Sequence, residues 1–549
     1  MKQKKQKWIV VGLLIVIIIN GGVLRFWNIQ NTRNVDEHNI IDNAVVVAEG
    51  KWHIRWYNWP AQSLIHIDGV VLAVAYQWAH RLNPEISSVQ EWYIKNPQII
   101  RAIAHGITVL FGVLAIFLAY ILGRRLTASP WAGLLTAGLL AVNYLHSLHS
   151  RFATPDVPLA TCYLGALLSC LYYLKAQTKK QRCAWALAAG AVIGITLATK
   201  YTGALVVAPI AVAVLWRNLK QTNWKKTVIL DLLCLMSGLI IFHFIFNPFV
   251  LGDWQIVLKA LHQEANPSRL GADWGGKSGA FWKNLWFYWQ GSLAWNGTVI
   301  SLIAYVTMIW SVIRWQKPFW KNFLLITVLY LVTLLGLSSL GLHWSRWSLP
   351  LTVLLELFAS VGIWCIIKYF KKKIKQKVLL KIITAVFLAI IIFPQLLLSV
   401  VQAAVAQPPT TSVEVSNYLK SLSPNGASVA ADAYFIEPGS NFKVSEPGIG
   451  LYDQTVAEYK KQKVNYLVVK ATRLGDAKKQ SDKYQNIITF FDDLKTTTTK
   501  LQRFSEQHGE TILDHKKDFG VYRWLWQNRH NLSSIIEVRD GDIYTVYSL

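Results

Sequence analysis

Long apolar stretches, separated by short polar connections, occupy most of the first 405 residues of this 549-residue chain. A helix needs about 20 consecutive, mainly apolar residues to cross the hydrocarbon core of a bilayer. Counted on that length, the stretches predict about 11 transmembrane helices. They run near residues 8–27, 98–123, 130–148, 156–174, 183–199, 202–216, 227–247, 291–313, 322–342, 347–367 and 378–404. The pattern therefore predicts a polytopic α-helical membrane protein.

Basic residues in the connections predict how these helices are oriented. Cytoplasmic connections of membrane proteins carry an excess of Lys and Arg. Here the basic groups lie in alternate connections, near residues 2–7, 124–125, 175–182, 217–226, 314–321 and 368–377. We therefore predict a plasma (inner) membrane protein with a cytoplasmic N-terminus. Residues 28–97, residues 248–290 and everything after residue 405 would then lie outside.

Residues 63–80 test this count, because they are apolar but contain His66 and Asp68. If this segment crossed the membrane, the orientation of every later basic group would be inverted. We predict instead an interfacial or re-entrant helix packed on the bundle. An aromatic belt precedes it at Trp52, Trp56, Tyr57 and Trp59.

The composition changes after Gln407-Pro408-Pro409, where polar residues become frequent. Segments 428–431 and 466–470 have the pattern of strands, and segments 413–422 and 487–494 that of helices. We predict two domains on this basis. Residues 1–405 form the transmembrane domain with outer loops 28–97 and 248–290, and residues 406–549 form a soluble extracytoplasmic α/β domain.

Composition narrows the class of protein further. Hydrophobic residues make up 53% of the chain and the mean hydropathy is +0.31. This composition is more apolar than that of a soluble protein. The net charge of +26 lies largely in short connections, as an orientation signal, so no nucleic-acid partner is expected. The absence of a P-loop argues against an ATP-driven pump. All cysteines lie within or beside predicted spans, which leaves no disulfide framework outside: Cys162, Cys170, Cys183, Cys234 and Cys365.

Acidic residues near the predicted outer face are the strongest sign of chemistry. Asp36 and Glu37 lie shortly after the first span, and Asp156 begins the fourth. An inverting sugar transfer needs a carboxylate to deprotonate an acceptor hydroxyl, and cations or a metal to stabilise a phosphate leaving group. Asp36 can supply the carboxylate. Candidates for binding the donor phosphate are Lys200, Arg346, Arg269 and Arg151.

Each candidate also has a purely structural interpretation. An Asp-Glu pair in a loop is commonly a solvated turn or a helix cap, and Asp156 after Pro155 could cap the fourth helix. Lys200 near the end of a span could extend its amine to the interface, and Arg346 or Arg151 could anchor the chain there.

Four motifs occur in an order that resembles a known family. They are residues 36–37 (DE), 151–156 (RFATPD), 199–203 (TKYTG) and 345–350 (SRWSLP). In their order and shared sidedness, over most of residues 1–405, they resemble the protein O-mannosyltransferase and aminoarabinose-transferase group of membrane glycosyltransferases. The C-terminal domain is also placed as in many bacterial relatives.

The resemblance implies the glycosyltransferase-C fold and a polyprenyl-phosphate-linked monosaccharide used on the outer face. It also implies that Asp36 is the catalytic base, that Glu37 supports it or contacts acceptor or metal, and that Asp156 organises the site. Trp347 departs from the family, which commonly has Tyr after this Arg. Contacts made there by a hydroxyl are therefore not implied.

These observations predict an inverting hexosyl- or pentosyltransferase that moves a monosaccharide from polyprenyl phosphate to a hydroxyl acceptor. Its expected partners are the lipid-linked donor, an acceptor protein, lipid or glycan, and membrane lipids. The sequence requires no cofactor, although a divalent metal cation could bridge phosphate and carboxylate.

Two other functions stay open. A transporter or flippase for a lipid-linked or anionic solute would also have many spans and a polar outer vestibule. Such proteins tend to have internal repeats and ionisable residues near the bilayer midplane, and this chain shows no clear repeat. A non-catalytic scaffold that recruits partners predicts that Asp36 can be lost without consequence.

Overall fold

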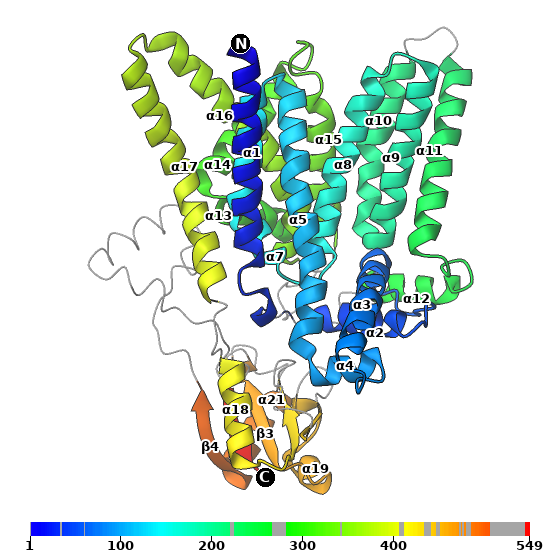
Figure 1. Ribbon diagram of the computed structural model, residues 1–549, viewed down its shortest axis with the longest axis vertical. Coiled ribbons are helices and arrows are strands. Elements are labelled where there is room, and N and C mark those ends of the chain that lie inside the picture. Colours follow the sequence, from blue (N-terminus) through cyan, green and yellow to red (C-terminus); the bar gives the residue numbers. More distant parts are fainter. Residues whose placement is uncertain are drawn as a thin grey trace.

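The computed structural model is a bundle of long helices with a smaller unit built around a sheet at one end (Figure 1). The structure describes residues 2–32, 34, 36–59, 61–219, 224–265, 281–340, 343–405, 411–432, 441–445, 451–470, 474, 477–478, 485–504 and 544–549. The largest buried apolar cluster lies inside the bundle and draws on helices from both halves of the chain.

Eight helical segments in the described part of the chain are long and apolar enough to cross a membrane. They are α1 (Lys2–Phe26), α5 (Pro97–Thr127), α8 (Asp156–Lys175), α9 (Lys179–Thr199), η2 with α10 (Tyr201–Val206, Val207–Asn218), α11 (Trp224–Phe246), η3 with α16 (Ser345–Ser348, Leu349–Lys373) and α17 (Lys377–Val405). Shorter apolar helices are α6 (Pro130–Val142), α14 (Thr298–Ile313) and α15 (Phe323–Ser338). The predicted polytopic helical protein is confirmed, whereas the count of 11 spans stays a prediction.

Two of the expected spans are interrupted in the structure. Within the expected span 130–148, α6 ends at Val142 and a separate helix, α7 (Tyr144–His149), follows. The expected span 291–313 is likewise divided between the end of α13 (Phe281–Trp295) and α14. Gly297 has φ +89°, a conformation that glycine adopts without strain. The Asn143 amide at the first break donates to Asn296 Oδ1 (3.2 Å) and to Glu356 Oε1 (2.8 Å). A hydrogen bond between Asn143 and Asn296 therefore joins the two breaks inside the bundle.

Short helices gather at the end of the bundle nearest the sheet-containing unit (Figure 1). They are α2 (Glu37–Ala48), α3 (Gln62–Leu82), α4 (Val89–Lys95) and α12 (Trp254–Ala265). The helix expected over 63–80 is present as α3, which packs along α2 and is not among the candidate spans. The interfacial placement of this helix and the membrane orientation stay predictions.

The C-terminal elements form a five-stranded mixed sheet in the order β2-β1-β3-β5-β4. The strands are β1 (Ser428–Ala431), β2 (Lys443–Ser445), β3 (Tyr466–Lys470), β4 (Thr499–Phe504) and β5 (Tyr544–Ser548). β1 pairs in parallel with β2 and β3, and β5 pairs antiparallel with β3 and β4. Helices α18 (Thr411–Leu422), α19 (Val456–Lys461) and α21 (Gln485–Thr497) accompany the sheet. Leu467 packs in a cluster with α19 and α21, and Val468 in one with α18, so both faces are covered.

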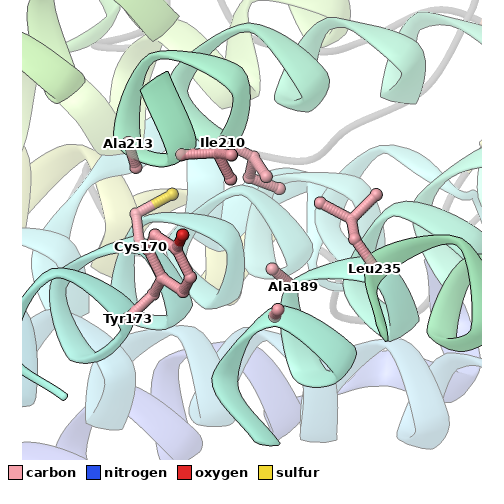
Figure 2. Close-up of a pocket in the computed structure, with 8 residues that line it drawn as sticks. Cys170, Tyr173, Ala189, Ile210, Ala213 and Leu235 are labelled. Carbon is pink, nitrogen blue, oxygen red and sulfur yellow. The ribbon is translucent and has the colours of Figure 1, made fainter. Parts of the chain in front are cut away.

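Glycines bring α9 and α11 into backbone contact. A Cβ added at Gly190 would overlap the Leu235 carbonyl oxygen, and one at Gly238 would overlap the Leu187 carbonyl oxygen. Small residues allow this close approach where the surrounding solvent is lipid. Beside the contact, Ala189 and its neighbours line a small apolar pocket between α8, α9, α10 and α11 (Figure 2). Its lining contains no charged residue, which makes it a packing feature of the bundle rather than a polar site.

We expect Gly190→Ala and Gly238→Ala to destabilise the protein, because the new Cβ would meet a backbone carbonyl that cannot move independently. Overpacking of this kind costs about 1–3 kcal/mol. The melting temperature in detergent, followed by tryptophan fluorescence, should fall for both variants. Gly12→Ala is the matched control, because a Cβ there has nothing within 4 Å. An unchanged melting temperature for Gly190→Ala would show that the two helices do not pack this closely.

Candidate functional site

Two carboxylates and two cations form a continuous charged cluster at the end of the bundle where α2 begins. Arg346 Nη2 lies 2.5 Å from Asp36 Oδ2, and Arg346 Nε lies 3.7 Å from Asp156 Oδ2. Lys200 Nζ lies 2.6 Å from Asp156 Oδ1. We call Asp36, Asp156, Lys200 and Arg346 the charged cluster. The structure thus brings together one residue from each of the four motifs.

Local backbone structure explains how each of these side chains reaches the cluster. Asp36 immediately precedes α2, and its N–H donates to Asn34 Oδ1 (2.9 Å). Asp156 is the first residue of α8, where a negative charge is favoured by the helix dipole. Lys200 ends α9 in an extended conformation, and Arg346 belongs to the single turn η3 that leads into α16.

Burial differs between the two carboxylates. The Asp156 side chain is 3% exposed, whereas that of Asp36 is 24% exposed. A charge withdrawn from water is costly unless it is paired, and Asp156 contacts two cations. Asp36 has one ion-pair partner in the described structure and remains open to solvent at the edge. Asp156 can therefore hold the cations in place, while Asp36 is accessible to a substrate.

Glu37 points into a different environment from Asp36. Its Oε2 lies 2.9 Å from His105 Nε2, and His105 Nδ1 donates to the Ile29 carbonyl (2.8 Å). Both partners of the Glu37–His105 pair are buried. The contact ties the start of α2 to α5, and the predicted role of Glu37 in catalysis is left as a prediction.

Of the other two candidate cations, the structure describes Arg151, whose guanidinium donates to backbone carbonyls. Arg151 is 1% exposed and donates to the carbonyls of Gln402 (2.9 Å) and Trp27 (2.5 Å). Its own carbonyl accepts from Thr32 Oγ1 (2.9 Å). These contacts join the ends of α1 and α17 to the segment before α8. Arg269 lies outside the described residues.

A second acidic centre connects the two long loops. Asp253, just before α12, is 5% exposed at its side chain and accepts from His53 Nε2 (2.6 Å) and Tyr57 Oη (2.9 Å). Arg55 Nε lies 3.6 Å from its other oxygen. Burial raises the pKa of Asp253, but the hydrogen bonds from His53 and Tyr57 and the nearby charges outweigh burial and leave it below its ordinary value. Tyr201, next to Lys200, donates to the Tyr57 carbonyl (2.7 Å), so this contact reaches the cluster.

Several residues around the cluster were not predicted from the sequence. His149 is 7% exposed, and its burial lowers its pKa to about 4. The positive charges of Arg346 and Lys200 also lower this pKa, whereas the negative charge of Asp156 raises it. Its position two residues before the RFATPD motif could have drawn attention to it. Trp344 likewise lies two residues before Arg346. No pattern in the sequence predicts the pairing of Asp253 with His53.

The cluster does not have the composition of a metal site. Within the described ranges, no group of three His, Cys, Asp or Glu residues is arranged to hold a metal ion. Asp36 and Asp156 are each paired with a cation, and Glu37 is turned towards His105. A divalent cation would therefore have to displace Arg346 or Lys200 from the carboxylates.

Comparison with known proteins places this arrangement in context. Residues 79–257 match the family model of dolichyl-phosphate-mannose-protein mannosyltransferases, and this segment contains Asp156 and Lys200. No curated protein matches the chain significantly in sequence. The archaeal oligosaccharyltransferase AglB from Archaeoglobus fulgidus, solved with an inhibitory peptide and a dolichol-phosphate, has a TM-score of 0.55 at 14% identity, covering 84% of this chain and 69% of that one. ArnT from Cupriavidus metallidurans, solved with undecaprenyl phosphate bound, has a TM-score of 0.47 at 16% identity, covering 75% of this chain and 72% of that one.

The likeness to AglB shows a shared fold, and the family match adds a sequence relationship over part of the chain. The predicted resemblance to the protein O-mannosyltransferase-like group of membrane glycosyltransferases is thereby confirmed.

We expect Asp253→Asn to loosen the contact between the two outer loops, because a neutral amide cannot replace a carboxylate that accepts from His53 and Tyr57. Loss of hydrogen bonds to a buried charged group costs about 1–3 kcal/mol. Hydrogen–deuterium exchange of residues 51–59 should therefore rise about 5- to 150-fold at pH 7.

The same contact should depend on pH in the native protein. Because the pKa of Asp253 is lower in the folded state, its stabilisation is present above the unfolded value of about 3.9 and is lost as pH falls through the folded value. Exchange of residues 51–59, corrected for its intrinsic pH dependence, should rise as pH falls below about 4. Equal exchange in Asp253→Asn and native protein at pH 7 would contradict the assignment.

Proposed function

We propose that this chain transfers one monosaccharide, with inversion, from a polyprenyl phosphate to the hydroxyl group of an acceptor on the outer face of the membrane. The observation that carries this proposal is the partly exposed Asp36 carboxylate beside two cations held on a buried carboxylate. The family match supports the class of reaction. The dolichol-phosphate in the AglB structure supports the class of donor.

Asp36 acts as the general base in this proposal. The acceptor hydroxyl gives its proton to the Asp36 carboxylate while its oxygen attacks the anomeric carbon. The bond from that carbon to the phosphate oxygen breaks on the opposite face, and its electron pair stays on polyprenyl phosphate. A positioned general base contributes about 10²–10⁴-fold to such a reaction.

Arg346 and Lys200 stabilise the charge that develops on the leaving phosphate. Both are already desolvated in part, with side chains 20% and 12% exposed, so their attraction to an anion is stronger than in water. Asp156 holds the two cations at one point and so orients them before the donor arrives. Because Asp36 and Asp156 are paired with cations, no step is assigned to a metal ion.

Arg346 has a second role, because it also forms an ion pair with the Asp36 carboxylate. A carboxylate oxygen 2.5 Å from a guanidinium must release that group before it can accept a proton there. A donor phosphate offers Arg346 a competing anion with bidentate geometry. Binding of the donor would therefore free Asp36, and the base would become available only when a donor is present.

We expect Asp36→Asn to abolish sugar transfer, with a fall of about 10²–10⁴-fold in kcat, because the amide cannot accept the proton. Transfer from a panel of radiolabelled polyprenyl-phosphate monosaccharides into membrane acceptors measures this and identifies the sugar. Asp42→Asn, in the helix that Asp36 precedes, is the control at matched expression. Equal transfer by Asp36→Asn and native protein would remove Asp36 as the base. Solute movement across vesicles without any transfer would favour the transporter interpretation.

The shared Arg346 predicts an ordered reaction in which the donor binds before the acceptor. With both substrates varied, a non-reactive acceptor analogue should inhibit competitively against the acceptor and uncompetitively against the donor. Arg346→Gln should weaken donor binding about 10- to 100-fold and make the order random, because Asp36 is then always free. Lys200→Gln is the matched control: it also loses a phosphate contact but keeps the Arg346–Asp36 pair, so its order should stay fixed. Random order in the native protein would contradict this role of Arg346.

A further inference from the structure

We propose that Trp344 and Trp347 are positioning residues that seat the two donor-binding cations on their indole faces. The Arg346 guanidinium carbon lies 5.2 Å from the centre of the Trp344 ring, and Lys200 Nζ lies 5.4 Å from the centre of the Trp347 ring. Both distances are within the range of cation–π attraction, for which tryptophan is the best partner. Each cation of the charged cluster thus has an aromatic face on one side and a carboxylate on another.

One short turn supplies both rings. Trp344 immediately precedes η3 and Trp347 lies within it, so this one turn positions the backbone of both residues. The Trp347 N–H donates to the Trp344 carbonyl (3.1 Å), and Ser348 Oγ donates to the Ser345 carbonyl (2.6 Å). The turn continues directly into the buried start of α16. The rings are therefore held by a rigid element and not by a loose loop.

The two rings act on parts of the cations that the carboxylates leave uncovered. Asp156 fixes Lys200 at one oxygen, but an ammonium group on a flexible four-carbon chain has three donors and can rotate away. The Trp347 face limits that movement without satisfying a hydrogen-bond donor. The ammonium group therefore stays available for a phosphate oxygen. Trp344 constrains the Arg346 guanidinium in the same way, including after Asp36 has been released.

This inference rests on the proposed function for the identity of the anion, and it makes a distinct claim about Trp347. A seat for a cation requires a ring face, so phenylalanine and tyrosine should replace Trp347 in large part. A phosphate contact through a polar group of the side chain would instead make Trp347→Tyr and Trp347→Phe differ.

The experiment compares Trp347→Phe, Trp347→Tyr and Trp347→Leu in purified full-length protein, with polyprenyl phosphate binding measured directly and the transfer kinetics measured in parallel. Trp347→Leu should raise the Kd for polyprenyl phosphate and the KM for the donor about 2- to 30-fold and change kcat by less than about 2-fold. Trp347→Phe and Trp347→Tyr should stay within about 3-fold of the native values. Trp344→Leu and Trp344→Phe should show the same contrast. Trp310→Leu is the control, because Trp310 lies under Arg314, a cation outside the cluster.

The outcomes separate this inference from the proposed function. Unchanged polyprenyl phosphate binding in Trp347→Leu, or a loss in kcat with unchanged KM, would overturn the proposed positioning role of Trp347, even if the native protein transfers sugar. Binding that depends on the ring in a protein that transfers no sugar would overturn the proposed function and keep the seat. Equal losses in all three Trp347 variants, with a lowered melting temperature, would show that Trp347 only packs.

Discussion

Neutralisation of one buried carboxylate is the constraint on which the site depends. Asp156 is almost fully enclosed, and the cost of withdrawing an ion from water reaches several kcal/mol unless it is paired. Lys200 at the end of α9 and Arg346 before α16 therefore both converge on the start of α8. Elements far apart in the sequence meet at one point because a single negative charge requires them. The same pairing concentrates positive charge beside an exposed acid, as the transfer of a sugar from a phosphate demands.

Two neighbouring acids illustrate how environment separates roles. Asp36 belongs to the charged cluster and is partly exposed, whereas Glu37 turns inward onto His105. The inward contact fixes the beginning of α2 and with it the backbone of the preceding residue. The outward one leaves an oxygen where a substrate can reach it once Arg346 has moved. Adjacent carboxylates of similar chemistry thus differ in environment: Glu37 anchors the helix, and Asp36 is the group to which the proposed function assigns the proton transfer.

Much of this arrangement could be predicted from the sequence, because the strongest signals are local. Apolar length located the helices, and apolar patterning located the strands at 428–431 and 466–470. The motif order suggested that Asp36, Asp156, Lys200 and Arg346 share a site, and the structure brings them together. The remaining features depend on tertiary contacts. The division of two apolar stretches into separate helices, the carbonyls that Arg151 meets and the rings beside the cations follow from packing between distant segments, which periodicity does not encode.

The contacts of Arg151 connect α17, the last long helix, to the segment that precedes Asp156. Its guanidinium spans the end of α1 and the Gln402 carbonyl near the end of α17, while its backbone lies five residues before Asp156. α17 then leads towards the sheet-bearing unit (Figure 1). A tilt of α17 would therefore displace the segment that sets the position of the Asp156 carboxylate. Force applied to the C-terminal unit would therefore be carried by covalent and hydrogen bonds to the backbone just before Asp156.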